Sequence, residues 1–467
     1  MFGRKNSNIN EKELEYAKNH FNEVLHTTLN LEGPGFVRIH LVPPKIIDNT
    51  IAPSIAIING QDIIPINRSW TILLSEFIKE VNKYEGHEIS KEDVEKSFEN
   101  IYRTLSDIYP KVKRKRLEKD IYTIMNTFVA LAKREQVKGI KPMTLAEYAP
   151  YMKAPHRMDL IVSSLTKNGA WHCNNKCIHC YACGQPLVEE DELSTEDWMK
   201  IIDRLREIGI PQLTFTGGEP TLRDDLPELI KYARWFVTRL NTNGINLTKE
   251  YCKKLRDAEL DSVQITLYSY DEDIHNKLVG APTFKKTVEG IKNALEVGLN
   301  VSVNTPICKD NSDYVATLDF LKNLGVEYTT CSGLLKTGNA LTKESETLEL
   351  TKKELSYLLD NAILSTFPDG PEMAFTSPSC LDEDDTLFTF YGLNRPTCGA
   401  CLSNMAITPS GKVVPCQSDL SGTPLGDILK DSWEDIWNSE LCTKRRAYSC
   451  KQDGTCPLKE GINFEEN

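Results

Sequence analysis

Three cysteines within eight residues constrain this chain more than any other feature. The run 171–183 reads WHCNNKCIHCYAC and sets Cys173, Cys177 and Cys180 at C-x3-C-x2-C. Thiolates this dense on a short loop can converge on one soft metal centre. Structural zinc, the alternative, commonly uses four ligands in two C-x2-C pairs, which this spacing fits poorly. The motif therefore indicates a four-iron cluster with one iron that has no protein ligand and can bind a substrate.

This spacing resembles that of the radical S-adenosylmethionine (SAM) enzymes. The resemblance implies that Cys173, Cys177 and Cys180 hold a [4Fe–4S] cluster whose open iron chelates the amino and carboxylate groups of SAM. In that family an electron from the cluster cleaves SAM to methionine and a 5′-deoxyadenosyl radical. Tyr181, directly after the motif, is expected beside the cofactor, and Cys183 is expected to be a plain thiol.

Composition limits the class of protein. A length of 467 residues suggests two or three domains. The net charge of −12 disfavours nucleic-acid binding, and the basic stretch 111–119 is more typical of a solvated helix face. No run of about 18 apolar residues predicts a membrane span. Fourteen cysteines without a recognisable signal peptide favour a reducing compartment, and hence the cytoplasm.

The first 110 residues predict a small α+β module. We expect a helix over 11–25, a strand over 36–42, a hairpin turning at Asn59-Gly60 and helices from about 70 and 91. Ser90, with Asp93 three residues later, can cap the last helix. Residues 111–157 are expected to be a helical linker. The order of elements indicates a winged-helix-like module.

The segments IIPIN…WTILL and ISKEDVEKSFENIYRTL resemble the peptide-binding chaperone of pyrroloquinoline quinone (PQQ) biosynthesis, over about residues 36–110. Related modules recognise leader peptides on enzymes that modify ribosomally made peptides. The resemblance implies that a leader peptide adds a strand to the module's sheet. A DNA-binding winged helix, which the acidic charge disfavours, and a structural cap are the alternatives.

Residues 158–340 alternate between short strands and helices, which predicts parallel pairing with right-handed crossovers. The radical SAM resemblance implies a partial (β/α)6 TIM-type barrel, while the alternation alone also allows a doubly wound sheet. We expect strands at 159–164, 212–216, 236–241, 262–268, 300–305 and 327–330.

Ligands of such barrels gather at the carboxyl ends of the strands. TGGEP at 216–220 resembles the family's GGEP motif, which implies that Gly217, Gly218 and Glu219, with Pro220, hold the amino group of SAM. By position, further contacts to SAM are expected from residues that follow the next strands: Asn243, Thr266, Asn304 and Ser332. For each of these four alone, a structural hydrogen bond is an equal alternative.

Residues 341–467 predict a cysteine-rich domain. Cys398 and Cys401 form a C-x2-C pair, and a hairpin turning at 409–411 brings Cys416 to them. The element C-x9-G-x4-C resembles the SPASM (twitch-type) extension, which implies at least one auxiliary iron–sulfur cluster. The fourth ligand is expected to be Cys450 or Cys456; too few cysteines remain for two complete clusters. A zinc ribbon is the alternative.

Together these features predict a radical SAM oxidoreductase that modifies a ribosomally synthesised precursor peptide, by a thioether or carbon–carbon crosslink or related hydrogen abstraction. A low-potential donor such as ferredoxin or flavodoxin is the expected electron source. An epimerase would need a cysteine that returns a hydrogen atom, for which Cys308, Cys331 and Cys380 are available.

Two competing hypotheses stay open at this point. One is an enzyme that matures a sulfatase or builds a small cofactor. The sulfatase-maturing enzymes that this chain resembles have an aspartate directly after the cysteine equivalent to Cys416. This chain has Gln417 there, which weakens the sulfatase hypothesis. The second is a metal-stabilised winged-helix regulator without enzymatic activity, which offers no reason for GGEP at the end of a barrel strand.

Overall fold

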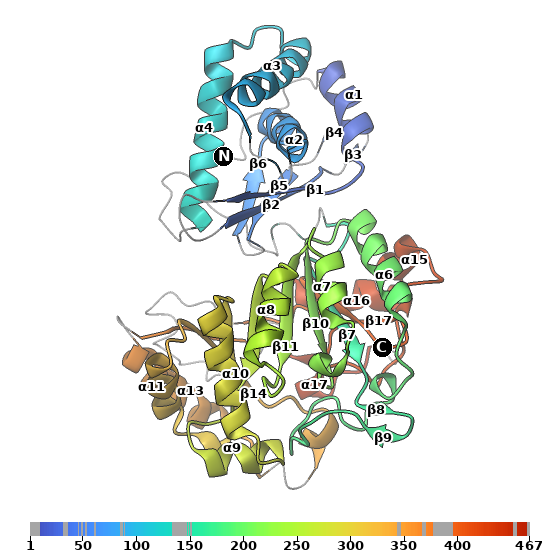
Figure 1. The fold of residues 1–467 in the computed structure, drawn as a ribbon. Helices are drawn as coiled ribbons and strands as arrows, with labels where there is room; N and C mark the ends of the chain where they lie inside the picture. Colours follow the sequence, from blue (N-terminus) through green and yellow to red (C-terminus); the bar gives the residue numbers. More distant parts are fainter. Residues whose placement is uncertain are drawn as a thin grey trace. The chain divides into compact units, whose positions relative to one another are not determined.

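The computed structural model describes residues 10–30, 36–44, 46–47, 50–51, 54–59, 62–84, 87, 89–132, 147, 149, 152–342, 347–366, 370–376, 396–451 and 455–464. The chain folds into two compact units (Figure 1). The first unit comprises Met1–Ala154 and Arg204–Pro211, and the second comprises Pro155–Asp203 and Gln212–Asn467. Cys380 and the linker residues 133–146, 148, 150 and 151 lie outside the described residues.

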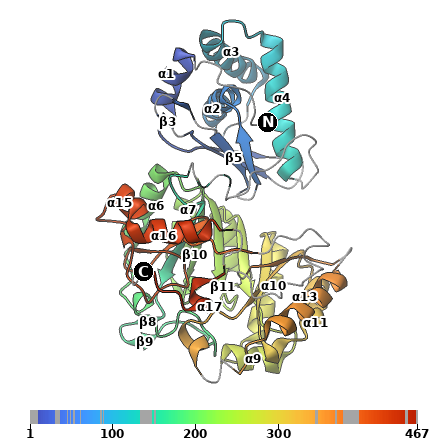
Figure 2. The same ribbon diagram turned by 180° about the vertical axis from the view of Figure 1, so that it is seen from behind.

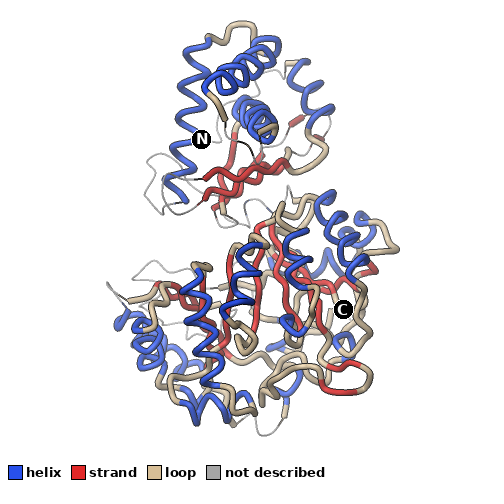
Figure 3. The backbone as a smooth tube through the Cα atoms, viewed as in Figure 1, coloured by secondary structure: helices blue, strands red, loops and turns tan. Residues whose placement is uncertain are grey.

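The first unit is a four-stranded antiparallel sheet with helices packed on it (Figures 1 and 3). The strand order is β1-β2-β5-β6, and α2 and α4 contact the sheet. β5 is buried along its whole length, and a single apolar core joins sheet and helices. The elements are α1 (Glu11–His20), β1 (Leu25–Asn30), β2 (Phe36–Val42), β3 (Ile46–Ile47), β4 (Thr50–Ile51), β5 (Ser54–Ile58), β6 (Asp62–Ile66), α2 (Arg68–Asn82), α3 (Lys91–Ile108) and α4 (Arg114–Ala132).

Local sequence explains most of this unit. Ser90 accepts the N–H of Asp93 while Asp93 accepts the N–H of Ser90, so the predicted capping box is confirmed. Asn59 has a φ of 49°, which confirms the predicted hairpin turn between β5 and β6. The prediction of a helix to residue 25 is wrong, because Leu25 begins β1, whose β-branched Thr27 and Thr28 favour a strand.

The second unit is built on a sheet of ten strands (Figures 1 and 2). The six predicted parallel strands are adjacent in the order β14-β13-β12-β11-β10-β7, which confirms the barrel core. They are β7 (Arg157–Ser163), β10 (Gln212–Gly217), β11 (Val237–Thr242), β12 (Ser262–Thr266), β13 (Val301–Ile307) and β14 (Tyr328–Gly333). The helices that connect and flank them are α6 (Thr195–Ile208), α7 (Leu226–Tyr232), α8 (Lys249–Asp257), α9 (Glu272–Val279), α10 (Phe284–Val297), α11 (Tyr314–Asn323) and α13 (Lys352–Thr366).

The sheet extends beyond the six predicted strands at both edges. β15 (Glu372–Phe375) pairs in parallel with β14, and β16 (Asn404–Ile407) pairs in parallel with β7. β17 (Lys412–Val414) and β18 (Gly426–Asp427) complete an antiparallel extension, and α15 (Trp433–Asn438), α16 (Glu440–Ser449) and α17 (Pro457–Glu460) follow. The cysteine-rich segment is therefore joined to the barrel by β-sheet hydrogen bonds. The boundary at residue 340 stays a proposal.

The two faces of the sheet differ in polarity. Leu213, Phe215 and Leu240 on one face are completely buried, as are Val263, Ile265 and Val303. On the other face, the alternate positions of β12 and β13 are half-buried polar residues: Ser262, Gln264, Thr266, Ser302 and Asn304. Since neighbours in register on parallel strands point the same way, this second face is a continuous polar surface, which we call the lumen face.

Because the apolar face carries the packing, we expect Phe215→Ala to lower the free energy of unfolding by about 3–5 kcal/mol. Ser302→Ala, on the lumen face, should change it by less than about 1 kcal/mol. Denaturant titrations of the two variants beside the parent would measure this. Equal losses would show that the faces do not divide in this way.

Candidate active site

The three motif cysteines lie on an irregular loop that follows the first barrel strand. β7 leads through a short hairpin, β8 (Thr166–Lys167) and β9 (Ala170–Trp171), into the loop 172–185, which we call the cluster loop. Trp171 orders it by donating from Nε1 to the carbonyl of Asn175 at 2.9 Å. Ala182 is buried in an apolar cluster that includes residues of β7 and β16. The side chains of Cys173, Cys180 and Tyr181 pack against the same cluster.

Neighbouring elements hold the cluster loop from several sides. Its Ile178 N–H donates to the carbonyl of Leu278 in α9 at 3.1 Å. The Asn339 N–H donates to the carbonyl of Cys180 at 2.9 Å, and its side-chain amide donates to the carbonyl of Cys177 at 3.2 Å. Because an irregular loop leaves many of its backbone groups without a partner in the loop itself, these contacts help to fix where the three thiols stand.

Gly338 makes this contact possible. Its φ is +57°, and a Cβ atom there would lie 2.4 Å from the carbonyl oxygen of Tyr181 and 2.5 Å from that of Cys180. Only glycine allows both the left-handed backbone and this close approach.

The thiols are a donor set that fits an iron–sulfur cluster. Burial raises the pKa of Cys173 to about 12 and also raises the pKa values of Cys177 and Cys180. A metal removes this cost, because ligation replaces the thiol proton. Among the described residues, no group of three His, Cys, Asp or Glu side chains is arranged around a single ion.

The GGEP segment lies against the cluster loop. The Cys173 thiol donates to the carbonyl of Gly218 at 3.3 Å. Gly217, with a φ of +143°, lies so close to β7 that a Cβ atom would be 2.4 Å from the Ser163 carbonyl oxygen. Pro220 begins the short 3₁₀ helix η3 (Pro220–Leu222). The two glycines therefore let the second strand's end meet the cysteines.

Glu219 is 1% exposed and its carboxylate is held by hydrogen bonds. Its Oε1 accepts from the Thr221 N–H at 3.0 Å and from the Thr242 hydroxyl at 2.7 Å, while Oε2 accepts from the Asn243 N–H at 2.8 Å. Burial nevertheless raises its pKa, and the hydrogen bonds from Asn243, Thr221 and Thr242 oppose that rise. Because a carboxylate oxygen can accept two hydrogen bonds, Oε2 retains capacity for a further N–H beside that of Asn243.

The remaining predicted cofactor residues lie along one edge of the lumen face. Asn243 follows β11, and its amide donates to the side chain of Asn174 in the cluster loop. Thr266 is in register with Asn304, whose Oδ1 accepts the Thr330 hydroxyl at 2.8 Å. Ser332 lies on the same face of β14, two residues after Thr330. The fold thus brings Asn243 to the cluster loop and sets the other three side by side.

Thr242, in the polar run 241–244 that follows the third barrel strand, donates to Glu219. Two other residues that contribute here carried no signal in the sequence. Gln185 links the cluster loop to the C-terminal segment, donating to the carbonyls of Tyr181 at 2.6 Å and Ser418 at 3.2 Å. His179 is 6% exposed and packs edge-on against Tyr268 at 4.9 Å; both of its ring nitrogens lack a hydrogen-bond partner within the described chain. Burial lowers its pKa to about 4.

The C-terminal cysteines form a second group. Burial raises the pKa of Cys416 to about 12, and Cys398 and Cys456 lie close enough to raise it further. Cys401, which is fully buried, contacts the Cys442 thiol. Cys450 differs, since Arg446 rather than another cysteine is the charged group that affects its pKa. The thiols of Cys398, Cys416 and Cys456 therefore lie near one another, and those of Cys401 and Cys442 are in contact beside Cys416.

Cys308 and Cys331, two cysteines considered above, and Asp419 differ from these groups in their surroundings. Cys308 and Cys331 are completely buried in apolar clusters, as barrel-core thiols. Asp419, two residues beyond Gln417, is buried and pairs with Arg445. A base for sulfatase-type chemistry is therefore not offered by Asp419.

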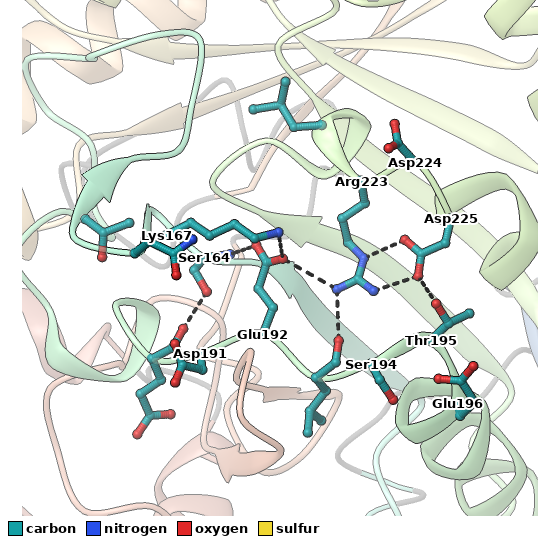
Figure 4. Close-up of a pocket in the computed structure, with 15 residues that line it drawn as sticks. Ser164, Lys167, Asp191, Glu192, Ser194, Thr195, Glu196, Arg223, Asp224 and Asp225 are labelled. Atoms are coloured by element: carbon teal, nitrogen blue, oxygen red, sulfur yellow. Dashed lines mark hydrogen bonds and ion pairs between the residues drawn. The ribbon is translucent and has the colours of Figure 1, made fainter.

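A polar pocket of about 550 Å³ lies beside the end of β7 (Figure 4). Glu192 accepts the Ser164 N–H at 3.0 Å, and the Arg223 guanidinium lies 3.8 Å from it and pairs with Asp225 at 2.7 Å. None of the predicted cofactor residues lines this pocket. Its side chains hold the loops at the ends of β7 and β10.

Family models match two parts of the chain. The radical SAM superfamily model matches residues 172–328, and the SPASM model, an iron–sulfur cluster-binding domain, matches residues 398–457. Among the described residues, every helix is too short or too polar to cross a bilayer.

Relatives and solved structures agree with these matches. Fe-coproporphyrin III synthase of Methanosarcina barkeri is 40% identical over 155 residues, 32% of this chain and only 38% of that protein. PqqA peptide cyclase of Streptomyces rochei is 27% identical over 275 residues, 56% of this chain and 72% of the relative. The structure of Streptococcus suis SuiB bound to S-adenosylmethionine shares the fold with a TM-score of 0.57, at 17% identity over 87% of this chain and 92% of SuiB.

We expect Gly338→Ala to lower the iron bound by the reconstituted chain by about four atoms, because the new Cβ displaces the carbonyls of the cluster loop. Gly298→Ala is the matched control, since Gly298 also has a positive φ but nothing lies within 4 Å of its added Cβ. Iron analysis of both variants measures the effect. Equal iron contents would mean that Gly338 does not position the loop.

Proposed function

We propose that this chain, which contains a radical SAM domain and a SPASM domain, modifies a ribosomally synthesised precursor peptide by radical chemistry. The observation that carries the proposal is the contact of the Cys173 thiol with the carbonyl of Gly218, at 3.3 Å, which joins the three-cysteine loop to GGEP. When bound, the four-iron cluster supplies the electron that cleaves SAM to methionine and a 5′-deoxyadenosyl radical. The peptide would be the source of the hydrogen atom that this chemistry removes.

The residues of the barrel would each have a distinct task. Cys173, Cys177 and Cys180 would hold the cluster, and the second acceptor position of Glu219 Oε2 suits the amino group of SAM. Thr266, Asn304 and Ser332 would contact the rest of the cofactor from the lumen face. Tyr181, half-buried beside Cys180, would close the site from the cluster-loop side.

The SPASM domain would hold an auxiliary cluster through Cys398, Cys401, Cys416 and Cys456. The geometry favours Cys456 over Cys450, because Cys456 lies near Cys398 and Cys416. Such a cluster suits crosslinking, since it could accept the electron that remains after bond formation or bind a substrate thiolate.

The peptide substrate rests on two observations. PqqA peptide cyclases are among the relatives, and the first unit has the small sheet that the PQQ-chaperone resemblance predicts. Its edge strands are β1 and β6; Pro65 in β6 lacks an N–H, so β1 is the better edge for a leader strand. We place the enzyme in the cytoplasm with ferredoxin or flavodoxin as electron donor.

A small-molecule cofactor precursor is the second candidate substrate. Similarity to Fe-coproporphyrin III synthase favours it, although that match covers 32% of this chain.

We expect anaerobically reconstituted, reduced protein to release 5′-deoxyadenosine faster with one of the short peptides encoded beside its gene. That peptide should change in mass. Chromatography and mass spectrometry measure the two products. Cys177→Ala should abolish release, because it removes a cluster ligand, whereas Cys252→Ala, a buried thiol in α8, should retain it.

Release that no peptide changes would overturn the peptide substrate and leave the cofactor candidate. No release from protein that binds both iron and SAM would overturn radical chemistry altogether.

The auxiliary ligands give a separate prediction. Cys456→Ala should bind about four fewer irons than the parent, because it removes a ligand of a four-iron cluster. Cys450→Ala should retain them. Iron analysis and electron paramagnetic resonance of the two variants measure this, and the reverse pattern would make Cys450 the ligand.

A further inference from the structure

Two arginines point to the lumen face at the amino-terminal half of the strands. Arg157 begins β7, and Arg239 is the third residue of β11. Arg239 is half-buried, yet no residue that the structure describes makes a hydrogen bond or an ion pair of 4 Å or less with it. Burial lowers its pKa, and the charge of Arg157 lowers it further.

A buried carboxylate on β7 is paired with the first of these cations. Asp159 is 1% exposed and pairs with Arg157, with 2.8 Å between Nε and Oδ1 and 3.3 Å between Nη2 and Oδ2. Tyr328, Asp159 and Asp261 lie near enough to favour the charge of Arg239. Oδ2 of Asp261 accepts the N–H and the hydroxyl of Thr238. Within the described part of the chain, the lumen face therefore carries a guanidinium fork to which no acceptor is bound.

Two neighbouring donors are also unused. Gln212 is 6% exposed and Thr214 is 4% exposed, and neither Gln212 Nε2 nor Thr214 Oγ1 has a hydrogen-bond partner among the described residues. Thr214 is in register with both Asp159 and Arg239, and Gln212 is in register with Arg157. Buried polar groups are normally paired, so donors without acceptors indicate a missing ligand.

The position of these donors separates them from the SAM site. Thr242 in β11 donates a hydrogen bond to Glu219. Arg239 lies three residues before Thr242 in the same strand, so the two Cα atoms are roughly 10 Å apart. A ligand at Arg239 would thus lie deeper on the lumen face than the groups that GGEP and the cluster loop contact.

We propose that Arg239, with Thr214 and Gln212, binds the side-chain carboxylate of an acidic residue in the peptide substrate. A carboxylate fits because a guanidinium donates two parallel hydrogen bonds to it, and the amide and the hydroxyl can donate to its remaining lone pairs. This inference rests on the proposed function, and it makes Arg239 a specificity-determining residue.

Calorimetric titration of the reconstituted full-length protein, without reductant, tests it. The probes are the blocked pentapeptide acetyl-AAEAA-amide, its glutamine counterpart acetyl-AAQAA-amide, and glutarate. We expect the parent to bind the glutamate peptide at least about tenfold more tightly than the glutamine peptide, in the range of a hydrogen bond to a charged group. Arg239→Gln should remove that preference, and Arg256→Gln, an exposed arginine paired with Asp257, should retain it.

The outcomes are distinguishable from those of the turnover experiment, because binding needs no SAM cleavage. The inference is overturned if the parent binds the two peptides equally tightly. It is also overturned if the parent binds neither peptide at millimolar concentration. Binding of glutarate alone also overturns it, in favour of a small carboxylate substrate. Loss of glutamate-peptide binding when SAM is added overturns it as well, because it assigns these donors to the SAM carboxylate.

Arg239→Lys keeps the inference testable if Arg239→Gln does not fold, as judged by its melting temperature and iron content. Lysine retains the charge but not the planar fork, so the preference for glutamate should fall at least about threefold. A lysine variant that equals the parent overturns a bidentate contact.

Discussion

The site depends on the pairing of an irregular loop's backbone with elements far away in the sequence. The cluster loop has few backbone hydrogen bonds of its own, so Leu278 accepts one of its N–H groups and Asn339 donates to two of its carbonyls. The side chain of Gln185, at the end of the loop, donates to the carbonyl of Ser418. Each partner comes from a different part of the second unit. Gly338 and Gly217 allow the close approaches, because at both places a Cβ atom would meet a carbonyl oxygen. The thiols are thus presented by the whole unit rather than by their own motif.

The same pairing joins the two metal-binding regions. The side chain of Gln185 donates to the carbonyl of Tyr181 in the cluster loop and accepts the Leu420 N–H at 2.9 Å. In addition, β16 pairs with the edge of β7, the strand that precedes the cluster loop. One side-chain amide and one strand therefore connect the C-terminal segment to the cluster loop. This link gives a physical reason for two cysteine-rich regions to be parts of one unit.

Much of the fold and of the site was predictable because its signals are local. Alternating strands and helices indicated the six-stranded core, and C-x3-C-x2-C with GGEP indicated residues that the fold does bring together, Cys173 and Gly218. The contributions of Asn339 and Gln185 were not predictable, since they depend on contacts across more than 150 and 200 residues. The pairing of β16 with β7 and of β15 with β14 was missed for the same reason. Cys450 and Cys456 were equivalent by spacing, and only their surroundings separate them.

The division of the sheet into two faces resolves a conflict between stability and chemistry. Buried apolar side chains such as Phe215 and Leu240 hold the strands to their helices, so the opposite face is not needed for packing. It can therefore carry groups that a core would not tolerate, including Arg239 and the unpaired donors of Gln212 and Thr214. Their desolvation cost persists in the folded chain, and a ligand that supplies acceptors removes it. The polarity that makes this face a poor core is thus what would make it selective for its substrate.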